Sequence, residues 1–440
     1  MFEQLKAHCR FHSYTQFEAY LNSLGLFHMD FELDRIKLAV TKLFPKRLPY
    51  HTAQIIGTNG KGSTAHFLAS LARAHALPDG LFTSPHLLTL RERIRVRGQM
   101  LPEAEWLVCA NIVDAVQSPT SGERLTYFEF VFALALVAFA RAGIKLAVLE
   151  AGLGGEYDAT SAVPADLVLF TPISFDHEQI LGDTLAEIAA TKAGGVRPGQ
   201  ILLTTAQPPE ALAAMKAKAG KVGNRLLKPT PNQKFNYALG MLGHQQTENA
   251  LLALTGYMQL AEKLAWPVHK PAIVRALKTT FVPGRLQMIN PIFEKPAILL
   301  DGAHNPHAFE ALNKNISLYG LRPRCIIFNC MSDKHLDAAM PLLPLWTSGP
   351  IFIPPIENNP RACEPGRLAA ELGPQAIAVD SLKEALRRAA LEPALDCPPT
   401  PQRQLPLELS SPILICGSLY LLGDFFRLHP GMLERNLRIK

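Results

Sequence analysis

A glycine-rich loop between an apolar strand and a helix is the feature that most constrains how this chain can fold. Residues 52–56 read TAQII, an apolar strand pattern, and GTNGKGST follows at residues 57–64 before an Ala- and Leu-rich stretch typical of a helix. Glycines in such a loop let backbone N–H groups approach phosphate oxygens, and the helix directs its positive N-terminal end at the same place. The stretch therefore predicts a β-loop-α unit that binds a nucleotide phosphate.

The loop is more compact than the common P-loop, G-x-x-x-x-G-K-[ST]. Gly57 stands three residues before Gly60. Gly62 separates Lys61 from Ser63. Lys61 would bring a positive charge to the β and γ phosphates, and the Ser63 hydroxyl would bind Mg²⁺. A glycine-rich turn with an exposed lysine is the alternative interpretation, which the strand and helix on either side disfavour.

Apolar strand segments alternate with helical patterns along the rest of the chain. Because parallel strands need long crossover connections, which are usually helical, the alternation predicts an α/β fold with a mostly parallel, helix-covered sheet. The most apolar stretch, residues 130–140, is shorter than the roughly 20 residues that cross a bilayer and predicts a buried helix. The other expected strands are residues 146–150, 166–171, 201–205, 297–301, 325–329, 351–353, 376–380 and 413–417.

Two domains are expected. A chain of 440 residues is long enough for two or three domains, and the strand-helix alternation is interrupted near Pro283 and Gly284 before it restarts at residue 297. We assign residues 1–290 to an N-terminal P-loop ATPase-type domain and residues 291–440 to a smaller Rossmann-like α/β domain. The proline-rich stretch 391–412 is expected to be a surface loop before the last strand.

The composition excludes several classes of protein. With 48% hydrophobic and 19% charged residues, the chain is typical of a globular protein, and its formal charge of +6 is spread without a long Lys/Arg run. Nucleic-acid binding is therefore not indicated, and a small anionic substrate fits better. Seven scattered cysteines without a C-x-x-C pair indicate reduced, packed thiols. No signal peptide is visible, so we expect a cytoplasmic monomer that does not bind membranes.

An ordered set of further motifs accompanies the loop. The compact loop is similar to that of the Mur-type amide ligases, and its added glycine resembles the folylpolyglutamate synthase/dihydrofolate synthase family. The supporting segments are TSPHL (83–87), RERIRV (91–96), LTYFEF (125–130), LEAGLGGEYDAT (149–160), DHEQILG (176–182), TKAGGVRPG (191–199), PGR (283–285), DGAHNPHA (301–308), MSDK (331–334) and CGSLY (416–420). They follow the family's order over nearly the whole chain.

The resemblance implies an ATP-dependent ligase that adds L-glutamate to dihydropteroate, to the γ-carboxylate of a reduced folate, or to both. Its reaction would pass through an acyl phosphate and release ADP and phosphate, with two Mg²⁺ ions expected. Two anions must then meet, so metal ions, lysines and backbone donors are needed to hold the developing charge. Residues 1–290 would bind ATP and the pterin or folate, and residues 291–440 would be the C-terminal Mur-ligase-type domain.

The same resemblance assigns residues to ATP and to metal. The catalytic candidates are Lys61, Lys192 and His304. The ATP-binding candidates are Thr58, Asn59, Gly60, Lys61, Gly62, Ser63, Thr64, Asn249, Arg285, Asp301 and His304. The metal-binding candidates are Ser63, Ser84, Glu150, His177 and Lys192. Taken as bare residues, Glu150 could equally be a solvated strand-end carboxylate, His177 a loop hydrogen-bonder and Arg285 a linker arginine.

Lys192 would be carbamylated, by its match to the family's E-K-A-G-I segment. A carbamate would turn a cation into a carboxylate-like metal ligand, whereas an unmodified ammonium would repel Mg²⁺. A helix-end lysine that interacts with the helix dipole is the alternative. Asn305 could act simply as the cap of the following helix.

The pterin-binding candidates are Arg35, Thr126, Phe128, Asp158 and Ala159. Phe128 could stack on a flat ring or simply pack in the core. Asp158 could accept hydrogen bonds from a pterin or serve as a turn carboxylate. The segment 29–40 resembles the one that helps hold dihydropteroate in bifunctional bacterial members.

Four residues depart from the family pattern, and the charge reversal at Glu156 bears on substrate preference. Glu156 stands where arginine is common, Ser161 replaces asparagine, Thr191 replaces glutamate, and His335 replaces an acidic residue. The competing functions are a peptidoglycan-precursor Mur ligase and a decayed ligase that only binds nucleotide or folate. The former needs a domain-sized segment before the loop, whereas 54 residues precede Ile55 here. The intact Lys61 and Glu150 argue against the latter.

Overall fold

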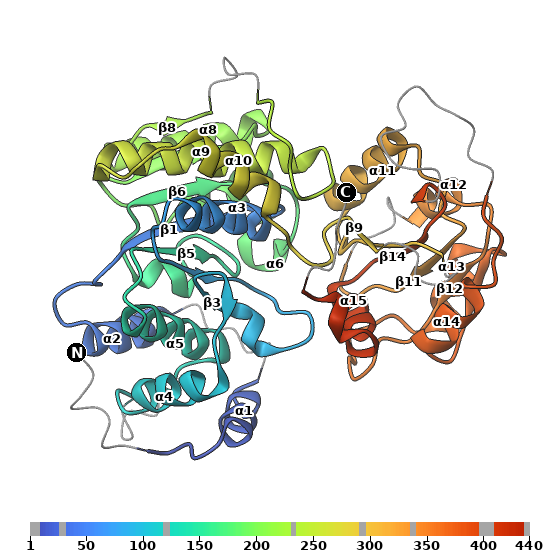
Figure 1. The fold of residues 1–440 in the computed structure, drawn as a ribbon, viewed down its shortest axis with the longest axis horizontal. Helices are drawn as coiled ribbons and strands as arrows, with labels where there is room; N and C mark the ends of the chain where they lie inside the picture. Colours follow the sequence, from blue (N-terminus) through green and yellow to red (C-terminus); the bar gives the residue numbers. More distant parts are fainter. Residues whose placement is uncertain are drawn as a thin grey trace. The chain divides into compact units, whose positions relative to one another are not determined.

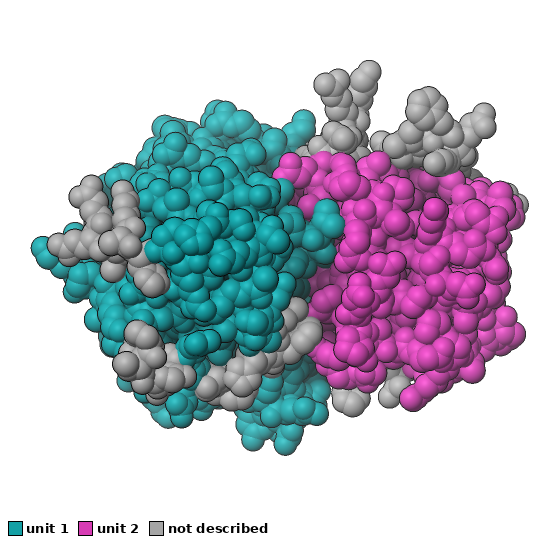
Figure 2. Space-filling model, turned by 90° about the horizontal axis from the view of Figure 1, so that it is seen from below, with its two compact units in different colours: residues 1–239, 247–280 teal, residues 240–246, 281–440 magenta. Residues whose placement is uncertain are grey.

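The computed structural model describes residues 9–25, 32–117, 124–229, 235–289, 296–334, 340–395 and 409–434. The chain forms two compact units, one of residues 1–239 and 247–280 and one of residues 240–246 and 281–440 (Figure 2). The units begin and end at other residues than the predicted domains 1–290 and 291–440, whose boundary stays a prediction. Within the described ranges, no helix is both long and apolar enough to cross a membrane.

The described part of the first unit contains an eight-stranded sheet in the order β4-β3-β2-β5-β1-β6-β7-β8 (Figure 1). Its strands are parallel except for β3, which runs antiparallel to both β2 and β4. The bounds are β1 His51–Ile56, β2 Asp79–Phe82, β3 Ile94–Val96, β4 Gln99–Met100, β5 Leu146–Glu150, β6 Leu167–Phe170, β7 Ile201–Thr204 and β8 Leu226–Leu227. The predicted mostly parallel sheet is confirmed.

Helices cover this sheet and bury its apolar side chains. Helix α3 packs on β1, β2 and β5, while α5 packs on β2 and is itself covered by α4 and α2. The bounds are α1 Tyr14–Ser23, α2 Asp34–Leu43, α3 Lys61–Ala74, α4 Glu103–Asp114, α5 Tyr127–Arg141, α6 Glu178–Leu181, α7 Leu185–Lys192, α8 Pro209–Lys221, α9 Gln245–Leu264 and α10 Lys270–Thr279. The expected buried helix at 130–140 is the middle of α5, where the side chains from Phe130 to Phe139 are all buried.

The second unit contains a smaller sheet of six strands in its described part, in the order β13-β12-β11-β14-β10-β9. Only β9 is antiparallel to its neighbour β10; the other described pairs are parallel. Strand bounds are β9 Gln287–Ile289, β10 Ile298–Leu300, β11 Cys325–Phe328, β12 Ile351–Ile353, β13 Ala376–Ala378 and β14 Ile413–Cys416. Helix bounds are α11 Pro306–Tyr319, α12 Leu343–Trp346, α13 Pro365–Leu372, α14 Leu382–Ala389 and α15 Leu419–Leu428. The predicted second α/β domain is thus confirmed in its fold class.

Candidate active site

The glycine-rich loop lies where three neighbouring parallel strands end. Strand β1 sits between β5 and β6, and the loop follows β1 at Gly57. Glu150 ends β5, and residues 171–177 follow β6. In parallel α/β sheets ligands bind beyond the carboxyl ends of the strands. The topology therefore brings three segments that are far apart in sequence to the carboxyl ends of β5, β1 and β6.

Two glycines allow the loop to pass close to its neighbours. Gly57 has φ +153°, and a Cβ there would lie 2.0 Å from Thr171 Oγ1. Gly60 is the N-cap of α3 with φ +88°, and a Cβ there would lie 2.5 Å from Asn249 Oδ1. Asn249 also accepts a hydrogen bond from the Thr64 hydroxyl at 3.4 Å. The structure thus places the ATP-binding candidate Asn249 directly against the glycine-rich loop.

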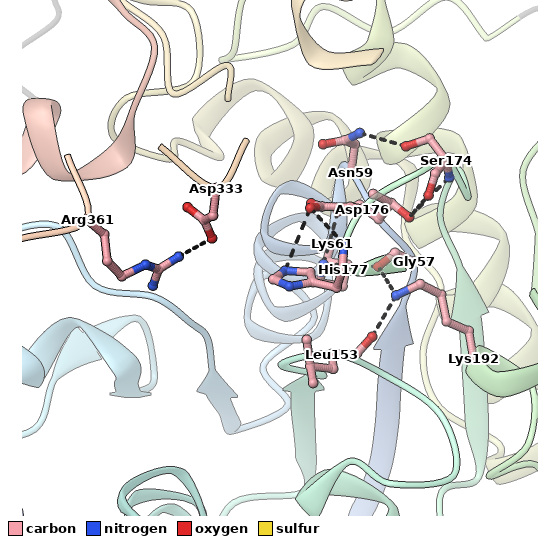
Figure 3. A network of polar contacts seen from close by, with 11 residues as sticks. Gly57, Asn59, Lys61, Leu153, Ser174, Asp176, His177, Lys192, Asp333 and Arg361 are labelled. Carbon is pink, nitrogen blue, oxygen red and sulfur yellow. Dashed lines mark hydrogen bonds and ion pairs between the residues drawn. The ribbon is translucent and has the colours of Figure 1, made fainter. Parts of the chain in front are cut away.

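Two lysines converge on one carbonyl of this loop. Lys61 Nζ donates to the carbonyl oxygens of Gly57 at 3.0 Å and Thr58 at 3.1 Å. Lys192, the last residue of α7, donates to the carbonyls of Gly57 at 3.2 Å and Leu153 at 2.6 Å (Figure 3). Lys192 is 3% exposed, and burial, with the nearby Lys61 charge, lowers its pKa to about 7. A substantial fraction of Lys192 is therefore a neutral amine at neutral pH.

A buried carboxylate lies beside the start of α3. Glu150 is 5% exposed and accepts a hydrogen bond from the Ser84 backbone N–H at 3.0 Å. Its Oε1 would lie 3.4 Å from a Cβ on Gly62, the residue before Ser63. Among the described residues, no group of three or more His, Cys, Asp or Glu side chains is placed to hold a metal ion. Carboxylate and hydroxyl oxygens are nevertheless the donors that Mg²⁺ prefers, so this corner fits the metal by its donor chemistry.

Asp176 and His177 lie between β6 and α6 and contact each other. Asp176 Oδ1 accepts the His177 backbone N–H at 3.1 Å and lies 3.9 Å from His177 Nε2 (Figure 3). His177 adopts a left-handed φ of +54° as the N-cap of α6. The negative charge of Asp176 also acts on Lys192, where it opposes the lowering of the lysine pKa by burial. Asp176 belongs to the DHEQILG motif, but its interaction with Lys192 depends on the tertiary structure, so the motif alone indicates no role for it.

Ser174 ties the loop to the segment after β6. The Thr58 hydroxyl donates to the Ser174 carbonyl at 3.0 Å and accepts its backbone N–H at 3.1 Å. Asn59 Nδ2 donates to Ser174 Oγ at 3.3 Å. These hydrogen bonds hold Thr58 and Asn59 against the segment after β6, so both residues have a structural role in the loop.

The pterin candidates come from α2, α5 and the short turn Ala159–Ala162, which pack on one another. Phe128 is partly exposed, and its ring lies 3.1 Å from the Cβ position of Gly152. Asp158 Oδ2 lies 3.5 Å from the same position. Ala159 is buried and belongs to the core around α5. The structure therefore brings both Phe128 and Asp158 close to the same position at Gly152.

Three of these candidates already have partners within the protein. Asp158 accepts the backbone N–H groups of residues 153, 154 and 160 and the Thr160 hydroxyl, at 2.6–2.9 Å. Thr126 caps α5 reciprocally with Glu129. Arg35 pairs with Glu129 at 3.4 Å, and both side chains are less than a tenth exposed. The turn-carboxylate alternative for Asp158 thus has direct geometric support, and a pterin role for these residues stays a prediction.

The second unit places its own candidates at the end of β10. Asp301 is buried and accepts the backbone N–H groups of Leu286 and Ala303, both at 2.9 Å. Burial raises the Asp301 pKa, and the Arg285 charge opposes that rise. His304 Nδ1 donates to the Gly302 carbonyl at 2.7 Å. Asn305 caps α11 through Ala308 N–H at 2.9 Å.

Glu156 and Thr191, two of the departures from the family pattern, are in contact. The Glu156 backbone N–H donates to the Thr191 carbonyl at 3.2 Å, and Glu156 Oε2 lies 2.8 Å from a Cβ position on Gly194. Ser161 donates to the Gly155 carbonyl at 2.7 Å. His335 lies outside the described residues.

Comparisons with known proteins identify the family of this chain. The family model "Mur ligase, glutamate ligase domain" matches residues 284–395. The chain is 30% identical to the dihydrofolate synthase/folylpolyglutamate synthase of Bacillus subtilis, over 69% of this chain and 76% of that protein. It is 35% identical to a probable bifunctional folylpolyglutamate synthase/dihydropteroate synthase of Haloferax volcanii, over 66% of this chain but only 37% of that longer protein.

Solved structures are similar over almost the whole length. Escherichia coli FolC in complex with DHPP and ADP has a TM-score of 0.79 and 26% identity, covering 95% of this chain and 98% of the other. A bifunctional folylpolyglutamate synthase/dihydrofolate synthase from Yersinia pestis, complexed with AMPPNP and a Mn ion, has a TM-score of 0.79 and 27% identity, with the same coverage of 95% and 98%. The chain belongs to the folylpolyglutamate synthase/dihydrofolate synthase family of the Mur ligase superfamily.

Proposed function

We propose that this protein is an ATP-dependent ligase that joins L-glutamate to a folate-type carboxylate. The acceptor is dihydropteroate, the γ-carboxylate of a reduced folate, or both. The products are the amide, ADP and phosphate. The observation that carries this proposal is the convergence of Lys61 and Lys192 on the Gly57 carbonyl, at the N-terminus of α3.

The reaction needs positive charge where two anions meet. A carboxylate is a poor acylating agent, so it first attacks the γ-phosphate of ATP and forms an acyl phosphate. The glutamate amine then attacks the activated carbonyl and releases phosphate. The backbone N–H groups at the start of α3 can cradle the phosphates, and Lys61 can move from its carbonyl partners to phosphate oxygens.

The buried corner at Glu150 supports use of a divalent metal. Glu150 together with Ser63 and Ser84 would hold Mg²⁺, and His177 would serve a second ion. The metal would neutralise phosphate charge during transfer. The similar Yersinia pestis structure carries a nucleotide analogue and a Mn ion, which supports use of nucleotide and divalent metal in this family.

Lys192 is suited to carbamylation because its amine is partly neutral. A neutral amine adds to the carbon of CO₂, forms an N–C bond and releases a proton. Burial, which lowers the Lys192 pKa to about 7, supplies the reactive form near neutral pH. The resulting carbamate would add an anionic oxygen ligand beside the loop.

The remaining candidates complete the two substrate sites. Arg285, Asp301 and His304 of the second unit would contact ATP, where a guanidinium suits phosphate oxygens. Phe128 would stack on the pterin ring, with Thr126, Asp158, Ala159 and Arg35 around it. Similar proteins have been solved with DHPP and ADP and with AMPPNP and a Mn ion, which supports a folate-type and a nucleotide substrate.

Release of ADP tests the proposal directly. Purified protein is mixed with ATP, Mg²⁺, L-glutamate and either dihydropteroate or tetrahydrofolate, and each component is omitted in turn. ADP that depends on glutamate and on one acceptor identifies that acceptor, and ADP with both shows a bifunctional enzyme. If neither dihydropteroate nor tetrahydrofolate leads to ADP release, a decayed ligase is favoured.

Lys61→Ala tests the role of the loop. Loss of this charge at a phosphoryl-transfer site should lower turnover by orders of magnitude. Lys216→Ala, an exposed lysine on α8, is the matched control and should leave turnover unchanged. Near-normal turnover in the Lys61 variant would refute the assigned role.

A further inference from the structure

Two cysteine thiols of the second unit face one another. Cys330 Sγ and Cys363 Sγ are 3.6 Å apart, although 33 positions separate the residues in sequence. Cys330 is 3% exposed, whereas Cys363 is partly exposed. Neither residue has a role in the proposed ligase reaction. Their approach is therefore a separate feature of the fold.

The backbone holds this pair in a fixed arrangement. Cys363 N–H donates to the Cys330 carbonyl at 2.9 Å, and Met331 and Ala362 form an antiparallel bridge next to them. The buried side chain of Asn329 accepts the Cys330 N–H at 2.7 Å and donates to the Cys363 carbonyl at 3.2 Å. The Asn329 side chain is thus hydrogen-bonded to the backbone of both cysteines. A close pair of thiols on a rigid scaffold needs little movement to form a disulfide.

The pair lies in two loops at the carboxyl ends of the parallel strands of the second sheet. Cys330 follows β11 and Cys363 belongs to the segment after β12, and β11 is parallel to β14, which is parallel to β10. Asp301 and His304 follow β10 at the same edge. Arg361 and Asp333 make a second connection between the two loops, at 2.5 Å (Figure 3).

We propose that Cys330 and Cys363 are a reversible oxidation site, at which an intramolecular disulfide ties the loops after β11 and β12 to each other. This inference does not depend on the ligase activity. The oxidant is a small-molecule disulfide of the glutathione class.

The exchange proceeds in two balanced steps. The more exposed Cys363 thiolate attacks one sulfur of the small disulfide, whose S–S bond breaks and releases one small thiol. The Cys330 thiolate then attacks the Cys363 sulfur and releases the second small thiol. Two electrons pass from the protein sulfurs to the small disulfide, and the two protein thiol protons end on the two released thiols. Burial raises the Cys330 pKa, which is consistent with Cys363 being the first thiol to react.

Thiol mapping of the whole protein tests this site. The protein is equilibrated with mixtures of oxidised and reduced glutathione, free thiols are alkylated, and peptides are identified by mass spectrometry. We expect loss of alkylation at Cys330 and Cys363 together, a cross-linked peptide lighter by two hydrogen atoms, and full reversal by dithiothreitol. Hydrogen exchange of residues 330–334 and 359–363 should slow in the oxidised form.

Two variants separate this pair from the other cysteines. Cys363→Ser should abolish the cross-linked peptide, whereas Cys9→Ser, which removes an exposed cysteine of the first unit, should leave it intact. A mixed disulfide at Cys363 that never resolves, or a disulfide of Cys330 with any other cysteine, would overturn the proposal. Full alkylation of both thiols of the wild-type protein in oxidising mixtures would also overturn the proposal. This outcome does not depend on whether the variants fold.

Discussion

Replacing Lys192 with methionine should make the protein more stable at neutral pH while it removes ligase activity. Burial and Lys61 lower the Lys192 pKa from 10.5 to about 7, so holding the ammonium in the folded state costs roughly 5 kcal/mol compared with the neutral amine. Methionine keeps most of the aliphatic stem and removes this charge. It also leaves the Leu153 carbonyl without the donor at 2.6 Å, which costs about 1–3 kcal/mol. The Gly57 carbonyl keeps Lys61 as its donor.

The pH dependence follows from the direction of the Lys192 pKa shift. Between about pH 7 and pH 10.5 the unfolded state holds the Lys192 proton and the folded state does not, so the free energy of unfolding rises with pH. Wild type should gain about 2 kcal/mol from this group between pH 7 and pH 9. The Lys192→Met variant should therefore exceed wild type by roughly 2 kcal/mol at pH 7 and match it near pH 9.

Hydrogen exchange of the β1 and β6 amides reports the stability of the first unit by itself, and it should be measured in CO₂-free buffers. The matched control is Lys216→Met on the exposed side of α8. Parallel pH profiles for wild type and the Lys192 variant would refute a depressed lysine pKa in the folded protein. Restored bicarbonate should stabilise wild type only, because the variant has no amine to carbamylate.

Three further substitutions test separate parts of the site. Gly60→Ala places a Cβ 2.5 Å from Asn249 in a left-handed conformation; it should destabilise the protein by at least about 1–2 kcal/mol and weaken nucleotide binding in titrations, whereas Gly220→Ala, with open space around it, should do neither. Asp176→Asn should lower kcat by about tenfold or more, and also lower the unfolding midpoint, because a carboxylate whose charge offsets that of Lys192 is lost; an unchanged kcat would contradict this. Arg35→Met leaves Glu129 buried without its partner and should cost about 3–5 kcal/mol in urea unfolding, most of which Glu129→Gln should restore in the double variant.

The sequence was sufficient for the features that local pattern determines. The strand at β1, its glycine loop and α3 are contiguous, so composition and spacing alone located them. The apolar runs at β5, β6 and β7 are long enough to be recognised as buried strands. The parallel arrangement followed from the helices between them.

Other elements depend on contacts that sequence does not reveal. Strand β2 begins with Asp79 and Gly80, which are poor strand residues. Gly80 is needed because a Cβ there would lie 2.5 Å from Phe139 of α5. The sequence allows Asp158 to be either a pterin ligand or a turn carboxylate, and only the structure shows the four donors around it.

The placement of charge explains why the loop needs so many supporting segments. Two lysine side chains meet at Gly57, and one of them is almost fully buried, so its charged form opposes folding. Asp158 and Asp176 partly offset this charge, and they lie on the segments that follow β5 and β6, the two neighbours of β1. An anionic triphosphate would satisfy the same lysines more completely. A site that is electrostatically costly when free and relieved by its ligand gains binding free energy at the phosphates, where transfer also requires positive charge.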